Sequence, residues 1–330
     1  MHDTDRTLPI PLGWYCIGYG DDLAPGEVRS LRYFARDLVL YRTMDGAITL
    51  AEAHCPHLGA HLGGGHIEDD GLRCPFHHWK FAAGGACIEV PYASHSGAIR
   101  ERAHLDVLPV AEHDGFIWAW HHPHGRPPSF PVKTFEEIES GEWTDYQKRE
   151  WTIATHVQET GENAVDSAHF LAVHGVPDLL ARPEVRFEGH LRVSDLPMEL
   201  TRITEGKGLE KGRYVDGRIL TMNSGPGQTW TRQIGVADLL IIGLPTPIER
   251  DRLVLRFACS VPRAQVESRG RLSQAIIQNA FDQVEQDIPI WEHKKYLERP
   301  VLCDGDGPIA DYRRWFGQFY AEDRRGESGG

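Results

Sequence analysis

The chain has 330 residues, of which 41% are hydrophobic and 25% charged, and its formal net charge at pH 7 is -13. This composition is typical of a soluble globular protein of one large or two ordinary domains, and the negative charge argues against a nucleic-acid partner. No stretch approaches the roughly 20 apolar residues of a membrane span, and the N-terminus lacks the features of a signal peptide. The sequence therefore predicts a cytoplasmic protein without a membrane span.

Short segments in which apolar and polar residues alternate fill the first third of the chain. They lie at residues 14–17, 38–41, 48–50, 88–90 and 115–120, and turn residues separate them. Asp45-Gly46, between the second and third segments, is typical of a tight β-hairpin. Alternating segments of this length favour a small antiparallel sandwich, so the first domain is predicted to be all-β.

Two short motifs in this domain combine cysteine with histidine. Cys55-Pro-His57 is followed by Cys74-Pro-Phe-His77, and glycines and prolines flank both. Two thiolates suit one ferric ion and two imidazoles the other, so these four side chains are candidate ligands of a [2Fe–2S] cluster. The alternative is a structural zinc knuckle, but zinc knuckles usually carry two cysteines on one hook, and each hook here carries one.

The cluster motif resembles the Rieske family. Rieske proteins of respiratory chains carry an extra cysteine in each loop, but Ala60 and Phe76 stand at those places here. The resemblance is therefore to the Rieske domains of ring-hydroxylating oxygenases, which implies that no disulfide joins the loops and that the potential lies lower in the Rieske range. The remaining cysteines are expected to be buried free thiols. These are Cys16, Cys87, Cys259 and Cys303.

Prolines concentrate between Pro123 and Pro131, where neither a strand nor a helix can continue. We therefore predict a Rieske domain at 1–125, including an N-terminal extension, and a catalytic domain at 126–330. The expected elements of the second domain are helices at 153–173 and 269–299, strands at 218–222, 239–244 and 253–258, a mobile loop at 206–227 and a disordered tail at 321–330. Strands between helices indicate an α+β helix-grip domain, in which an antiparallel sheet wraps the last long helix.

Polar residues concentrate between Asn163 and His174, in a segment that otherwise has the pattern of a buried helix. Burying so many polar groups is costly unless something satisfies them. His169 and His174 lie about 140° apart on an ideal helix, so the helix must end or distort between them, and Gly175 supplies the stop. A capped helix with two ordinary core histidines is the alternative. The spacing of Asn163, Asp166 and the two histidines resembles the mononuclear iron motif of the same oxygenases.

A non-haem iron(II) site that activates oxygen takes two histidines and one carboxylate, and the last helix offers Asp282 and Asp287. The apolar face of this helix includes Val284. At ~100° per residue, Asp287 lies about 60° from Val284 and Asp282 about 160° away. Asp287 is therefore predicted to point to the core and bind the metal, next to a kink at Pro289. The alternative is a carboxylate paired with a lysine or an arginine.

The resemblance also implies how electrons travel. A ferredoxin and an NAD(P)H-dependent ferredoxin reductase supply them, and the cluster of one subunit serves the iron of its neighbour in a homotrimer. Asp166 matches the carboxylate that links the two sites, and Asn163 belongs to the same catalytic motif. Trp79 is expected either to shield the cluster or to be an ordinary core aromatic. A basic patch is expected either to dock the ferredoxin or to be ordinary surface; it comprises Arg73, Lys80, Arg100 and Arg102.

The C-terminal segment 284–320 is similar to the oxygenase component of 3-ketosteroid 9α-hydroxylase and to the cholesterol 7-desaturases. The resemblance implies a terminal oxygenase, a monooxygenase rather than a dioxygenase, which uses O2 to hydroxylate or desaturate a small apolar, steroid-like substrate. Metazoan desaturases carry a membrane anchor that is not found in this sequence, which favours the soluble bacterial type. The alternatives are an aromatic or methoxy-aromatic substrate, with dihydroxylation or O-demethylation, and a Rieske electron carrier or a binding module without catalysis.

Overall fold

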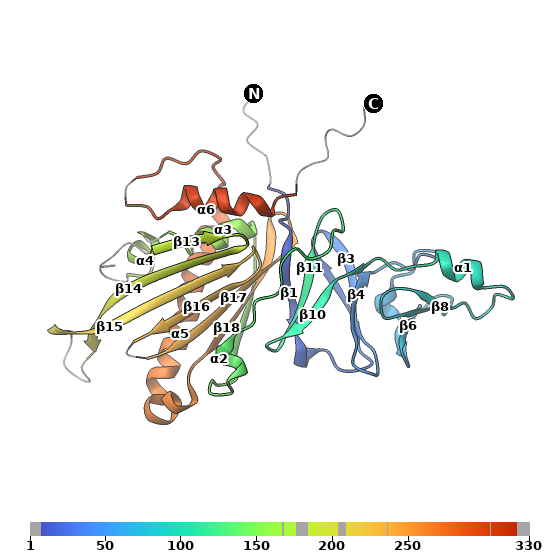
Figure 1. Ribbon diagram of the computed structural model, residues 1–330, viewed down its shortest axis with the longest axis horizontal. Coiled ribbons are helices and arrows are strands. Elements are labelled where there is room, and N and C mark those ends of the chain that lie inside the picture. The colour runs from blue at the N-terminus through green and yellow to red at the C-terminus, as the bar shows by residue number, and fades with distance from the viewer. Residues whose placement is uncertain are drawn as a thin grey trace. The chain divides into compact units, whose positions relative to one another are not determined.

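The computed structural model describes residues 8–166, 168–175, 184–203, 209–235, 237–303 and 305–321 (Figure 1). The chain forms two compact units. One is Trp14–Val132, and the other comprises the residues from Lys133 onward together with those before Trp14. The sequence placed a division between residues 125 and 126, and that division stays a prediction about the functional domains.

The first unit is built almost entirely of β-strands, which confirms the all-β prediction. Its three sheets have the strand orders β1-β11-β10, β2-β3-β4-β9 and β5-β6-β7-β8. The strands are β1 (Gly13–Tyr19), β2 (Val28–Tyr33), β3 (Arg36–Arg42), β4 (Ile48–Glu52), β5 (His66–Glu68), β6 (Gly71–Arg73), β7 (Lys80–Ala82), β8 (Cys87–Glu89), β9 (Val107–Leu108), β10 (Val110–His113) and β11 (Phe116–His121), and a short helix α1 covers Gly97–Arg102.

The predicted hairpin lies between β3 and β4. The Thr43 amide donates to the carbonyl of Ala47 at 2.9 Å, and Gly46 has φ +94°, a conformation that glycine adopts without steric cost. The two strands then pair in antiparallel register from Leu38 opposite Glu52. Local turn chemistry thus fixes this register, as the sequence predicted.

The second unit is one antiparallel sheet of seven strands packed on a long helix, which confirms the α+β helix-grip prediction. The strand order is β12-β18-β17-β16-β15-β14-β13. The strands are β12 (Gln147–Ile153), β13 (Glu184–Glu188), β14 (Leu191–Ile203), β15 (Leu209–Ser224), β16 (Thr229–Ile234), β17 (Leu239–Glu249) and β18 (Arg252–Ser260), and the helices are α2 (Glu136–Glu139), α3 (Val157–Glu162), α4 (Ala168–Ala172), α5 (Arg263–His293) and α6 (Ile309–Phe316).

Helix α5 contacts β12, β17 and β18 and lies against the sheet in Figure 1. Its apolar face places Ile277 and Phe281 in a core with Leu239 and Cys259. Arg269 is the one residue within α5 whose backbone angles are not helical. The helix continues through Pro289 to His293 with helical backbone angles, which proline's own φ allows, and the kink predicted there stays a prediction.

The structure corrects three sequence expectations. Residues 153–173 form the end of β12 and two short helices instead of one helix, because the side chains of His156 and Asp166 accept hydrogen bonds from backbone amides and start a new helix at each place. Residues 209–224 form β15 rather than a mobile loop, since β14 and β16 pair with it on both edges; residues 204–208 lie outside the described part. Cys303 is exposed, whereas Cys16, Cys87 and Cys259 are buried free thiols. The predicted tail beyond residue 321 also lies outside the described residues.

Helix α6 holds α3 in place through charge and close packing. The guanidinium of Arg313 donates two hydrogen bonds, of 2.5 and 2.9 Å, to the carboxylate of Glu162. Tyr312 is buried, and a Cβ on Gly161 would lie 2.0 Å from its hydroxyl oxygen. Only glycine therefore fits at position 161 unless Tyr312 shifts.

This close approach predicts that Gly161→Ala lowers the free energy of unfolding by ~1–3 kcal/mol, as overpacking does in other cores. Adding Tyr312→Phe removes the nearest atom and should recover part of the loss. The control is Gly270→Ala in α5, where an added Cβ meets nothing within 4 Å and should not destabilise. Denaturant unfolding of the full chain measures all four proteins, and equal stability of Gly161→Ala and the wild type would contradict the packing argument.

Candidate metal centres

Two loops of the first unit share one backbone hydrogen-bond pattern. In the first loop, the Cys55 amide donates to the carbonyl of Ala60 at 2.9 Å, and the Gly59 amide donates back to Cys55 at 2.9 Å. In the second, the Cys74 amide donates to the carbonyl of Trp79, again at 2.9 Å. Each cysteine therefore begins a tight turn that returns to the same residue.

The fifth residue of each turn has a positive φ. Gly59 has φ +74° and His78 has φ +58°. The left-handed conformation costs a non-glycine residue roughly 1–2 kcal/mol, so the second loop is strained at His78 where the first is not. The amide of His78 donates to the carbonyl of Cys74 at 3.1 Å, which completes the shared pattern.

The four predicted cluster ligands lie together at the ends of these loops. Cys55 and Cys74 are 3% and 2% exposed, and the rings of His57 and His77 are half-buried with centroids 4.7 Å apart. Burial, with a smaller contribution from Cys74, raises the pKa of Cys55 to about 11. A thiol that is costly to ionise in an apolar interior fits an iron site, because bound iron replaces its proton.

Aromatic side chains surround the two imidazoles. Trp79 is buried and stacks on His57, with centroids 4.5 Å apart and the ring planes inclined by 7°. Its indole N–H donates to the hydroxyl of Tyr92 at 2.9 Å. The structure thus places Trp79 against a predicted ligand, whereas Phe76 and Tyr92 are largely exposed.

Arg73 stabilises the second loop through a hydrogen bond and two ion pairs. It is buried, donates to the carbonyl of His78 at 2.8 Å and to Glu89 at 2.6 Å, and forms a further ion pair with Glu68. One guanidinium therefore ties the strained turn to two strands.

The predicted basic patch is wrong for two of its four members. Lys80 is buried and pairs with Asp70 at 3.0 Å, and Arg73 is neutralised by its two glutamates. Arg100 and Arg102 are exposed. The sequence could not separate these cases, because the acidic partners come from other strands and turns.

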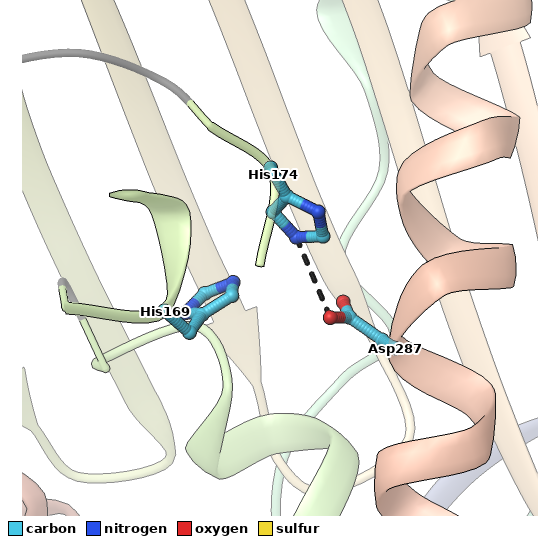
Figure 2. Close-up of side chains that lie close together, drawn as sticks. All are labelled: His169, His174 and Asp287. Carbon is cyan, nitrogen blue, oxygen red and sulfur yellow. Dashed lines mark ion pairs between the residues drawn. The ribbon is translucent and has the colours of Figure 1, made fainter. Parts of the chain in front are cut away.

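A second group of ligand-type side chains lies in the other unit. His169, His174 and Asp287 offer one atom each within 4.8 Å of one another (Figure 2). They come from α4, the turn after it and α5. His169 is 8% exposed, Asp287 is 5% exposed, and the side chain of His174 is 2% exposed. The helix ends between the two histidines, and Gly175 follows with φ +64°.

Asp287 and Asp282 point in opposite directions, as the helical face predicted, since Asp287 is buried and Asp282 is exposed. Oδ1 of Asp287 lies 3.4 Å from Nε2 of His174. Its other oxygen accepts a hydrogen bond of 2.9 Å from the amide of Asn163. Its neighbours are therefore an imidazole and an amide rather than a lysine or an arginine.

Both histidines are held by the ring nitrogen that faces away from this group. Nδ1 of His169 donates to the backbone carbonyl of Asp166, and Nδ1 of His174 donates to Oε1 of Gln286 at 2.9 Å. Each Nε2 thereby keeps its lone pair, which faces inward. Metal-binding histidines usually donate their other N–H in this way.

The amide of Asn163 lies where the inward atoms converge. Its Nδ2 is 3.2 Å from Nε2 of His169 in addition to its bond to Asp287. Burial raises the pKa of Asp287 and lowers the pKa of His169. A neutral imidazole is the metal-binding form, and a cation would offset the cost of the buried carboxylate, so the group fits a divalent metal ion.

The carboxylate of Asp166 begins helix α4. Its Oδ1 accepts from the amides of Ala168 and His169 at 3.1 and 3.4 Å. The backbone carbonyl of Asp166 contacts the His169 ring, and the predicted role of its carboxylate in linking the two sites stays a prediction. Sequence reasoning also missed Gln286, whose position next to Asp287 was the only available signal.

Comparison with known proteins identifies the two units. Residues 13–110 match the Rieske [2Fe-2S] domain, and residues 119–320 match the 3-ketosteroid 9α-hydroxylase C-terminal domain. The chain belongs to the 3-ketosteroid 9α-hydroxylase family of Rieske oxygenases. It is thus an oxygenase component with a Rieske cluster domain, which excludes the zinc knuckle and the simple electron carrier.

Named relatives span most of this oxygenase. A probable 3-ketosteroid-9-alpha-monooxygenase, oxygenase component, from Rhodococcus rhodochrous is 30% identical over 94% of this chain and 80% of its own length. Cholesterol 7-desaturase nvd from Xenopus laevis is 29% identical over 94% of this chain and 72% of its own. The crystal structure of dicamba monooxygenase bound to dicamba is 18% identical, covers 93% of this chain and 96% of its own, and shares the fold with a TM-score of 0.73. No helix among the described residues is long and apolar enough to span a membrane.

The geometry predicts that Asp287→Asn removes the mononuclear iron and leaves the cluster. The substitution keeps the shape and deletes the charge that offsets a cation, so metal affinity should fall by at least about 10-fold. The measurement is iron per chain against acid-labile sulfide. Asp282→Asn, on the exposed side of the same helix, is the control and should keep the wild-type ratio. A wild-type ratio in Asp287→Asn would exclude this carboxylate as a ligand.

Proposed function

We propose that this oxygenase hydroxylates or desaturates a small apolar, steroid-like substrate, using O2 and electrons from a ferredoxin and an NAD(P)H-dependent ferredoxin reductase. The observation that supports it most is the match of residues 119–320 to the 3-ketosteroid 9α-hydroxylase C-terminal domain. The relatives named for 3-ketosteroid monooxygenation and cholesterol desaturation favour a steroid skeleton. They also favour a monooxygenase over a dioxygenase.

In this proposal, Cys55, Cys74, His57 and His77 hold the Rieske cluster. The buried cysteines and the half-buried histidines would supply the two thiolates and two imidazoles that hold such a cluster. Arg73 and the shared turns fix the loops before the cluster binds, which limits the conformational entropy that binding must overcome.

His169, His174 and Asp287 hold the non-haem iron(II) in the same proposal. A bound cluster would supply single electrons, and an iron held by these two histidines and one carboxylate would supply the chemistry that activates oxygen. Nδ1 of each histidine donates to an acceptor of the chain, the Asp166 carbonyl or Gln286, so Nε2 is the atom that would bind the metal. Asn163 can donate a hydrogen bond beside the reacting atoms, and this supports its assignment as a catalytic residue.

The assembly follows from the same proposal. Residues 1–125 form the Rieske domain and residues 126–330 the catalytic domain, and three copies form a cytoplasmic homotrimer. The cluster of one subunit then serves the iron of the next, and Asp166 lies on the route between them. Its position supports this assignment, because its carboxylate accepts a hydrogen bond from the His169 amide and its carbonyl contacts the His169 ring.

An aerobic single turnover tests the substrate. The reduced, iron-loaded protein is mixed with 3-ketosteroids, sterols and simple aromatics, and the products are identified by mass spectrometry. A steroid that gains one oxygen or loses two hydrogens is expected. Oxidation or demethylation of an aromatic alone would overturn the steroid assignment and leave the iron chemistry in place. His169→Ala, with its cluster intact, is the control and should give no product.

Asp166→Asn should keep both metal centres and slow turnover by about 10–100-fold, the usual range for groups that support metal ligands. Asparagine can still cap α4 through its side-chain oxygen, so the fold should persist. Asp166→Ala removes the cap as well and should lose about 1 kcal/mol of stability. Metal content, unfolding and single-turnover rate separate these effects, and full activity of Asp166→Asn would exclude the proposed role.

A further inference from the structure

Gln286 and Asp287 contact the two nitrogen atoms of one imidazole. Oε1 of Gln286 accepts from Nδ1 of His174 at 2.9 Å, and Oδ1 of Asp287 lies 3.4 Å from Nε2 of the same ring. Two consecutive residues of α5 therefore face opposite edges of the His174 ring. Figure 2 shows His174 facing Asp287 on the long helix.

The two histidines differ in what holds them. His169 lies within α4 and donates to the backbone of its own turn, at Asp166. His174 follows the end of α4, and within the described part of the chain Gln286 is its one hydrogen-bond partner at Nδ1. The position of the His174 ring therefore depends on a side chain that is remote in sequence and belongs to the helix of the carboxylate.

We propose that Gln286 is a positioning residue that fixes the tautomer and orientation of His174 and thereby sets how tightly the His169, His174 and Asp287 group binds its metal. An acceptor at Nδ1 holds the proton there and leaves the Nε2 lone pair free. This inference rests on the proposed function for the assignment of His174 as a ligand. It adds a residue that the ligand pattern does not contain.

The chemistry of the acceptor makes the inference directional. A glutamine oxygen is a neutral acceptor, so it orients the ring but polarises the Nδ1–H bond of the imidazole only weakly. A glutamate in its place is anionic and makes the imidazole a stronger donor to a metal. Methionine has a similar length and is a poor acceptor, so it leaves Nδ1 to water. The expected order of metal affinity is Gln286→Glu, then wild type, then Gln286→Met.

The test is equilibrium dialysis of the full, cluster-containing chain, first depleted of mononuclear metal, against Co(II), with bound cobalt counted by mass spectrometry. Gln286→Met should bind Co(II) about 10-fold more weakly than the wild type, and Gln286→Glu more tightly. Gln286 is exposed, so both variants should fold. Gln278→Met is the matched control, because Gln278 is on the same helix and contacts Arg149 and Asp282 instead of a ligand.

A second readout separates positioning from general stability. In the Co(II) protein, the Nδ1 proton of each ligand histidine gives a shifted, exchangeable NMR signal, and the His174 signal should exchange faster in Gln286→Met. Equal affinities and equal exchange in all Gln286 variants, with Co(II) binding still lost in His169→Ala, would overturn the role of Gln286 and leave the metal site standing. If His169→Ala binds Co(II) as the wild type does, the metal site and this inference both fail.

Discussion

The catalytic unit depends on keeping charged groups buried without leaving them unpartnered. Asp287 lies in an interior where an isolated carboxylate is costly, and it is stable there because an imidazole and an amide face it. The same demand applies around α3. Glu162 pairs with Arg313, and Glu159 pairs with Lys294 just beyond α5. Removing one member of such a pair is far more costly than the pair is worth, so these contacts constrain where α3 can lie.

These constraints converge on the segment that carries the candidate ligands. Arg192, which is fully buried, donates to the carbonyl of Ala164 at 2.7 Å and to Asn223 at 2.7 Å. Burial lowers its pKa to about 10, so it remains charged at neutral pH. The turn between α3 and α4 is thus fixed by a buried cation from β14, and Gly161 lets α6 approach from another side. Contacts from β14 and α6 therefore fix the position of the segment between α3 and α4, which leads to the candidate ligands.

The two candidate centres have different surroundings, and the difference matches what each must do. The cluster histidines are half-buried beside exposed aromatics, where a partner protein can approach. The other ligands are almost fully buried, where water is excluded and a reactive oxygen species is protected from side reactions. Both centres share one device, since hydrogen bonds that do not involve the metal-facing atoms fix the ligands beforehand. Arg73 and the turns do this for the cluster loops, and Gln286 is inferred to do it for His174.

The sequence by itself determined the class of both units and the identity of the candidate ligands. The cysteine and histidine ligands of the cluster lie at short spacing on single loops. The choice of Asp287 over Asp282 rests on a helical angle, which is a local property, so both predictions were possible without the tertiary structure. Tertiary structure decided what depends on distant partners. Residues 209–224 became a strand because two neighbouring strands pair with them, and Arg73 and Lys80 lost their role as surface charge because acidic side chains of other segments meet them. Gln286 could not be found from the sequence for the same reason, because the His174 ring that it contacts is remote in the sequence and only the fold brings the two together.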